Sequence, residues 1–370
     1  MKDNKTLHEF TIDTPIMQAL FNSGSKWPKE LRAASKGFRV IANNGVRKLR
    51  IGHAYDDELG HLDYDDEQLT IVPSRFPNLH EVIMENTCVT DVGALAGLSK
   101  LTRLSLRFSK SLVDVGMLYK LTALTDLNLS DTKVVDLGPV KDLTALTTLY
   151  LNDTKVVDLG PLKDLTKLAS LYLSDTKVVD LGLLAPLTAL TRLDLSQTNV
   201  VDLGPLKDLT ALTSLDLSFT KVVYLGPLED LTALTHLNLC YTKVVDFGPL
   251  EDLTYLNSLD LSFTKVTDLG PLEDLTALTS LDLTYTKVVD LGPLKDLTKL
   301  ASLYMCRTKV VDLGPLKDLT NLVRLNLCGT NVRDVGPLAA LTHLESLNLC
   351  GTMVDLAPLA PLFALTHLYV

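Results

Sequence analysis

Leucine and valine recur along most of this chain at fixed places in a repeating unit of 22 residues. The period is marked by the threonine that follows each Leu-x-Leu stretch, at Thr132, Thr154, Thr176, Thr198, Thr220, Thr242, Thr264, Thr286, Thr308, Thr330 and Thr352. In the unit Leu212 to Ala233, apolar residues fall at positions 1, 4, 6, 11, 14, 17 and 20. Units of this size cannot bury their leucines alone, so the period indicates a stack of like coils with one continuous core.

The first part of each unit predicts a short strand. Leu215 and Leu217 are two residues apart and therefore point to one side, while Ser214, Asp216 and Ser218 point to the other. One side of the resulting sheet is core, and the other is open to a partner.

The second part of each unit predicts a tight turn. In Asp202 to Leu206 the apolar residues are three apart, and Pro205 removes an amide donor where a helical turn begins. This favours a 3-10 turn over a full α-helix. Asp202 is placed to cap the free amides of the turn, and Tyr224 replaces this aspartate in the next unit.

These features resemble the 22-residue class of leucine-rich repeats found in bacterial internalins and in the related phosphatase-regulator family. The most specific segment is Asp-Leu-Gly-Pro-Leu-x-x-Leu-Thr, and the resemblance covers about Leu79 to Val370. It implies an α/β leucine-rich-repeat solenoid, a right-handed curved stack with a parallel β-sheet on its concave face and short 3-10 or helical turns on its convex face. Those families usually carry Asn after the strand; here Thr is expected to bond the turning backbone more weakly.

The pattern also predicts the organisation of the chain. Residues 79–370 form the regular repeats, and residues 49–78 form an irregular first repeat that contains an acidic loop. Residues 1–48 are expected to form a helical cap over the first repeat, because Leu31, Ala34, Phe38 and Ile41 have helical spacing. At the other end, apolar residues up to Val370 predict either a tolerated open edge or end-to-end self-association.

The segment from Trp27 to Ile51 resembles the latter part of an F-box, the ligase-adaptor docking motif that precedes leucine-rich repeats in some ubiquitin-ligase substrate receptors. It contains a Leu-Arg-x-x-Ser-Lys-x-Phe-Arg stretch, but it lacks the usual Leu-Pro opening. Three functions therefore stay open at this point: a plain binding scaffold, a substrate-recognition subunit of an F-box-type ligase, and a bacterial internalin-like effector or adhesin.

Charge and cysteine content restrict the class of partner and the cellular compartment. The net charge of −10 opposes a phosphate backbone, which argues against nucleic-acid binding. The five cysteines include no Cys-x-x-Cys pair and are odd in number, so reduced thiols in the cytoplasm are expected. The start of the chain lacks the pattern of a secretory signal, and no apolar stretch is long enough to span a membrane.

No pattern of catalytic, cofactor-binding or metal-binding residues is found, so an enzyme is not expected. Cys306, Cys328 and Cys350 share position 7 of consecutive units, which indicates either drift from serine or a redox or metal-binding column. The acidic loop lacks the spacing of a calcium loop. His236 is the only histidine expected to project from the concave strand face.

The concave face is where we expect a partner. Position 5 forms an acidic stripe, position 8 forms an aromatic one, and His236 lies beside them. The predicted binding residues are Asp194, Asp216, Phe219, His236, Asn238, Tyr241, Asp260, Phe263, Asp282 and Tyr285. They suit a protein or peptide with basic and apolar character. The alternative is that amplification of near-identical repeats copied these residues into columns without selection for binding.

Overall fold

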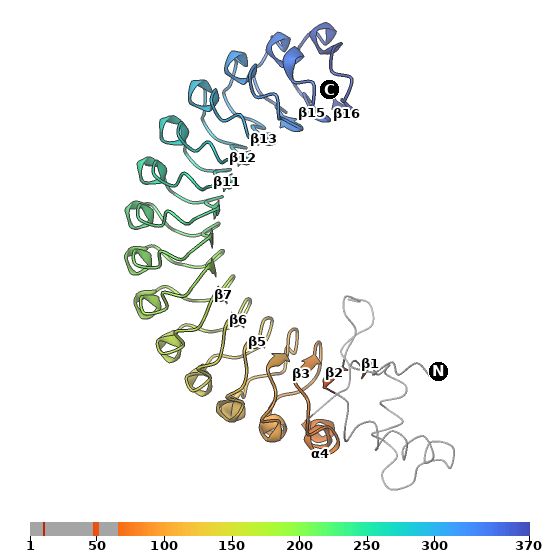
Figure 1. Ribbon diagram of the computed structural model, residues 1–370, viewed down its shortest axis with the longest axis vertical. Helices are drawn as coiled ribbons and strands as arrows, with labels where there is room; N and C mark the ends of the chain where they lie inside the picture. The colour runs from red at the N-terminus through yellow and green to blue at the C-terminus, as the bar shows by residue number, and fades with distance from the viewer. Residues whose placement is uncertain (1–9, 12–46, 52–65) are drawn as a thin grey trace, which may run out of the picture. The chain divides into compact units, whose positions relative to one another are not determined.

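The computed structural model describes residues 10–11, 47–51 and 66–370. The chain divides into two compact units, Met1–Val178 and Val179–Val370. In both units parallel strands alternate along the chain with short 3-10 turns, which confirms the predicted leucine-rich-repeat solenoid (Figure 1). The N-terminal cap and the F-box-like segment fall largely outside the described residues.

The described part of the first unit contains seven strands and two short α-helices. The strands are β1 (Phe10–Thr11), β2 (Lys48–Ile51), β3 (Glu81–Met84), β4 (Arg103–Ser105), β5 (Asp126–Asn128), β6 (Thr148–Tyr150) and β7 (Ser170–Tyr172). Helices α3 (Asp66–Leu69) and α4 (Ile71–Arg75) precede β3, and the 3-10 turns are η1 (Gly93–Gly97), η2 (Gly116–Lys120), η3 (Gly138–Val140) and η4 (Gly160–Leu162). Each strand pairs in parallel with the next one along the chain.

The second unit is more regular. Its strands are β8 (Arg192–Asp194), β9 (Ser214–Asp216), β10 (His236–Asn238), β11 (Ser258–Asp260), β12 (Ser280–Asp282), β13 (Ser302–Tyr304), β14 (Arg324–Asn326), β15 (Ser346–Asn348) and β16 (His367–Tyr369). The 3-10 turns are η5 (Gly182–Leu184), η6 (Gly204–Leu206), η7 (Gly226–Leu228), η8 (Gly248–Leu250), η9 (Gly270–Leu272), η10 (Gly292–Leu294), η11 (Gly314–Leu316), η12 (Gly336–Ala340) and η13 (Ala357–Leu359). Within this unit the strands lie on the concave side and the turns on the convex side (Figure 1).

The register of the strands follows the period of the sequence. Leu237 lies directly opposite Leu215 on one side and Leu259 on the other, and all three are at most 2% exposed. The seven apolar positions of the unit that starts at Leu212 are all buried, as the pattern predicts. Each fully buried leucine contributes about 2 kcal/mol relative to an exposed one, so the stacked columns are the main source of stability.

The recurrence of threonine after the strand in successive units has a hydrogen-bonding reason. The Thr220 hydroxyl donates to the Leu217 carbonyl at 2.6 Å, and the same bond of 2.6–2.9 Å recurs at the marker threonines from Thr132 to Thr352. Thr220 is only 4% exposed, so this bond satisfies its hydroxyl where water does not reach. The prediction that threonine bonds the turning backbone is therefore confirmed.

The 3-10 turns carry the predicted aspartate caps. The Gly204 amide donates to Asp202 Oδ1 at 2.8 Å, and the Gly248 amide donates to Asp246 Oδ1 at 3.0 Å. Tyr224 occupies the equivalent position between them. Its side chain is 65% exposed and lies over Gly226, so this turn has no carboxylate to accept the amide proton.

Replacing Tyr224 with the residue used by its neighbours is therefore expected to stabilise the protein. The Tyr224→Asp variant gains a cap hydrogen bond and loses little buried area, so the free energy of unfolding should rise by about 1 kcal/mol. Equilibrium urea unfolding followed by circular dichroism measures this change. The reciprocal Asp246→Ala variant should lose a similar amount, and an unchanged or lower stability of Tyr224→Asp would contradict the assigned role of the cap.

Candidate functional site

The residues predicted to bind a partner all lie in the second unit, on β8 to β12 and in the corners that follow the strands. The in-register pairing places Asp216 directly opposite Asp194 and Asn238, and Asp260 opposite Asn238 and Asp282. The structure therefore brings the two predicted stripes together as continuous columns. Their role in binding stays a prediction.

The aromatic residues at position 8 form a stacked column, which we call the aromatic ladder: Phe219, Tyr241, Phe263 and Tyr285. Successive ring centroids are 4.6, 4.3 and 4.5 Å apart, and the ring planes differ by only 14–15°. The backbone at all four positions is left-handed, with φ between 55° and 58°. The strand spacing thus fixes the rings face to face at the corner where the chain leaves the sheet.

This stacking determines which part of the aromatic ladder a partner can touch. The rings cover each other's faces, and the Arg307 guanidinium lies 5.2 Å from the Tyr285 ring centroid at the end of the column. Phe219, Tyr241 and Tyr285 are nevertheless 52%, 47% and 42% exposed. A partner therefore meets ring edges and the tyrosine hydroxyls, whereas the faces between the rings are closed to a cationic side chain.

The acidic stripe has a structural role that the sequence analysis missed. The Ser218 amide donates to Asp216 Oδ1 at 2.8 Å, and the Cys240 amide donates to Asn238 Oδ1 at 3.0 Å. Asp194, Asp260 and Asp282 accept the same bond from the amide two residues later. The signal was present in the sequence, because position 5 is Asp or Asn in most units and both residues offer this acceptor.

Two carboxyl groups of the acidic stripe are perturbed by their surroundings. Burial raises the pKa of Asp194 and of Asp282, and the neighbouring carboxylates of Asp216 and Asp260 raise them further. Hydrogen bonds from Ser196 and Thr284 act in the opposite direction. Ionisation of Asp194 and of Asp282 is therefore less favourable in the folded protein than in water.

His236 lies on β10 between Ser214 and Ser258, as expected, and its side chain is exposed. Its Nδ1 is 2.8 Å from the Thr235 hydroxyl. The prediction that no other histidine shares this strand position is wrong, because His367 begins β16 opposite Ser346. The last unit is one residue short, which hid this equivalence in the sequence.

The cysteine column consists of three free thiols. Cys306, Cys328 and Cys350 follow adjacent strands and are all free. Burial raises the pKa of the Cys306 thiol, and a side-chain hydrogen bond with Cys328 raises it further. A raised pKa disfavours the Cys306 thiolate, the form that metal binding and thiol exchange require, and the role of the column stays a prediction.

Comparison with known proteins identifies the repeats of this chain. A model of the leucine-rich-repeat family (two copies) matches residues 254–296, and a crystal structure of an internalin, inlF from Listeria monocytogenes, superposes with a TM-score of 0.76. This chain carries leucine-rich repeats and has their fold. The inlF comparison has 27% identity and covers 95% of this chain and 96% of that one. The repeats of this leucine-rich-repeat protein are thus of the 22-residue, internalin-like class.

Other solved structures share the fold at lower identity. The LRR protein LIC12759 of Leptospira interrogans is 19% identical, with a TM-score of 0.71, and covers 90% of this chain and 91% of that one. TLR13, in a structure titled as a complex with ssRNA13, is 19% identical with a TM-score of 0.55 and covers 86% of this chain and 59% of that one. No curated protein matches the sequence.

Within the residues that the structure describes, no group of three or more His, Cys, Asp and Glu side chains is arranged to hold a metal ion. The same residues include no helix with the length and apolar character needed to cross a membrane.

The raised pKa of Asp282 gives a test of the acidic stripe. Asn at this position keeps the Oδ1 acceptor, as Asn238 does, and removes the charge. Because the folded-state pKa is raised, ionisation of Asp282 lowers stability as pH rises through that value. The Asp282→Asn variant should therefore be more stable at neutral pH, by about 0.5 kcal/mol after solvent screening, and should lose this advantage near pH 3.5.

Urea unfolding at the two pH values measures the effect. The control is Asp282→Ala, which removes the acceptor for the Thr284 amide as well and should be destabilised at both pH values. If Asp282→Asn and the parent are equally stable at neutral pH, burial and like charge do not disfavour the ionised Asp282 side chain, which contradicts our interpretation.

Proposed function

We propose that this leucine-rich-repeat protein is a non-catalytic binding scaffold whose second unit holds a protein or peptide partner on its concave face. The observation that carries the proposal is the aromatic ladder, a rigid column of four stacked rings, three of them 42–52% exposed, beside a column of carboxylates. Large rings held in one conformation lose little entropy on binding, which is why aromatic residues dominate the energetics of protein interfaces.

The chemistry of the surface favours a partner that offers basic and apolar side chains. Each aspartate of the acidic stripe uses Oδ1 for its own backbone, and an Arg or Lys of the partner would contact the second oxygen, Oδ2. In the Asp216 carboxylate this oxygen already accepts a bond of 3.1 Å from the Asn238 amide nitrogen. Apolar groups of the partner would pack against the ring edges of Phe219 and Phe263.

A protein is a better partner for this face than a nucleic acid. The TLR13 structure shows that the fold also occurs in an RNA complex, but the face proposed here presents four aspartates and the chain has a net charge of −10. Both repel phosphates. We place the protein in the cytoplasm, because the cysteines in the described part of the chain are all free, as expected of a reducing compartment. Ligase-adaptor binding and end-to-end association stay predictions without a specific observation in their favour.

Affinity capture with a ladder-deficient variant tests the proposal. The four ladder residues are replaced by Gln, because Gln197 occupies the equivalent corner with the same left-handed backbone. Proteins retained by the parent should be lost or reduced about tenfold with this variant, since several large contacts are removed together. Circular dichroism checks that the variant retains its fold.

The matched control is Tyr255→Gln, which removes an equally large ring that is 69% exposed elsewhere in the same unit. This variant should retain the partners of the parent. If both the ladder variant and Tyr255→Gln lose the captured partners, or if neither loses them, the aromatic ladder does not form the binding surface.

A further inference from the structure

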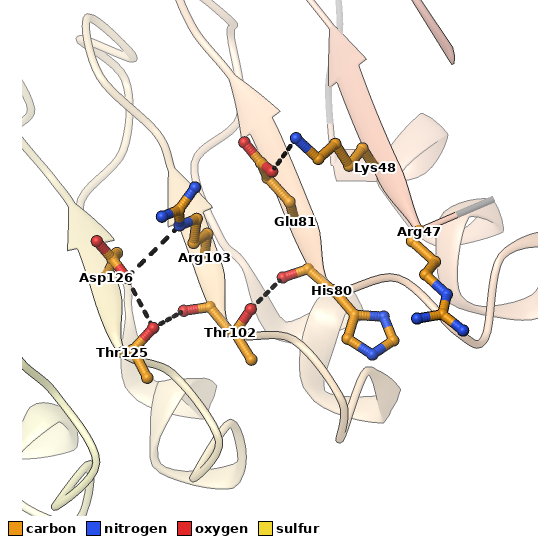
Figure 2. A pocket seen from close by; sticks show the side chains of 8 residues that line it. All are labelled: Arg47, Lys48, His80, Glu81, Thr102, Arg103, Thr125 and Asp126. Carbon is orange, nitrogen blue, oxygen red and sulfur yellow. Dashed lines mark hydrogen bonds and ion pairs between the residues drawn. The ribbon is translucent and has the colours of Figure 1, made fainter. Parts of the chain in front are cut away.

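A separate pocket lies in the first unit, where the chain enters the strands. Its volume is about 580 Å³, and it is open to solvent. Figure 2 shows the residues that line it: Arg47, Lys48, His80, Glu81, Thr102, Arg103, Thr125 and Asp126. They come from the starts of β2, β3, β4 and β5 and from the residues just before these strands. The concave-face columns of the second unit contribute nothing to this pocket.

Most of the charge around the pocket is internally balanced. Lys48 Nζ lies 3.1 Å from Glu81 Oε2 across β2 and β3, and Arg103 Nε lies 3.6 Å from Asp126 Oδ2 across β4 and β5. The Thr125 hydroxyl is also 2.7 Å from Asp126 Oδ2. Both acidic residues are therefore already paired and are poorly available to a cationic ligand.

Arg47 and His80 form the unbalanced part of the pocket. Their side chains lie beside one another and point away from the two ion pairs (Figure 2). Among the described residues, no side-chain partner of Arg47 is found within ion-pair distance. His80 Nδ1 is 2.9 Å from the Asn78 carbonyl, so Nδ1 is the donor, and in the neutral ring Nε2 is an acceptor that offers no hydrogen to an anion.

The threonines of the pocket cannot act as donors to a ligand. The Thr102 hydroxyl donates to the His80 carbonyl at 2.9 Å, and the Thr125 hydroxyl lies 3.1 Å from the Thr102 carbonyl. Of the two guanidinium groups that line the pocket, that of Arg47 is therefore the one without an ion-pair partner among the described residues. A planar guanidinium binds a carboxylate through two parallel hydrogen bonds, a geometry that an ammonium group cannot reproduce.

We propose that this pocket binds the carboxylate of an acidic side chain on a protein partner, with Arg47 as the bidentate contact and His80 beside it. A single carboxylate matches the one unpaired guanidinium. A nucleic acid would bring several phosphates toward Glu81 and Asp126, whose charges oppose it. The site is separate from the aromatic ladder and recognises the opposite charge.

Fluorescence anisotropy with a short labelled peptide of alternating glutamate and alanine tests the assignment on the full chain. The parent should bind this peptide and not the matched glutamine–alanine peptide, and Arg47→Gln should weaken binding about tenfold. Arg47→Lys keeps the charge but cannot form the two parallel hydrogen bonds, so its affinity should lie between those of Arg47→Gln and the parent. Arg47 is exposed, so these variants are expected to fold, and circular dichroism checks this.

The matched control is Arg192→Gln, which removes an exposed arginine from the first position of β8 in the second unit and should leave binding unchanged. The four-glutamine ladder variant should also bind the peptide normally, so failure here is distinguishable from failure of the proposed concave-face function. Equal binding of both peptides, no effect of Arg47→Gln, or tighter binding of a single-stranded oligonucleotide or of inorganic phosphate would overturn the proposal.

Discussion

The burial of leucine between successive coils is the constraint on which the rest of this structure depends. A unit of 22 residues has too little interior to fold alone, and each leucine is buried only because the equivalent leucine of the next unit covers it. Leu215, Leu237 and Leu259 lie directly opposite one another as a result. The same register carries every outward-facing side chain into a column, so the surface chemistry is a consequence of the core.

In the columns of the second unit, the same side chains make internal contacts and form part of the exposed surface. Asp216 accepts a backbone hydrogen bond through Oδ1 and a hydrogen bond from the Asn238 side chain through Oδ2. Phe219 occupies a left-handed corner and stacks on Tyr241, so its ring supports its neighbour while its edge stays exposed. Each of these residues is held in place by hydrogen bonds or stacking within the protein, and the proposed binding role of the face rests on this rigidity.

The sequence predicted the fold well because the fold follows from a repeated pattern of residues. The strand at Leu215 and Leu217, the 3-10 turn at Gly204–Leu206 and the Asp202 cap each follow from local spacing and local hydrogen-bonding chemistry. The chemistry of the concave face was harder to predict. One oxygen of Asp216 accepts a backbone hydrogen bond, and the ladder rings cover each other's faces. Both features depend on side-chain geometry, which the spacing of residues in the sequence does not determine.

The pocket around Arg47 was not predicted, because Arg47 and Lys48 precede the regular repeats that supply its other residues. Arg47, His80 and Thr102 each lie directly before the first residue of β2, β3 and β4, so the pairing of these strands brings them together, but the irregular spacing between Arg47 and His80 hides this equivalence in the sequence. Sequence reasoning based on columns finds sites that the period creates. It misses sites that arise where the period breaks down.

Site-specific photo-cross-linking tests the central claim most directly. A photoreactive phenylalanine analogue placed at Phe263 sits within the aromatic ladder, and the same analogue at Tyr255 lies outside it. If the concave face of the second unit binds the partner, illumination of the complex will link the partner to position 263 and not to position 255. Cross-links at position 255 alone would contradict this account.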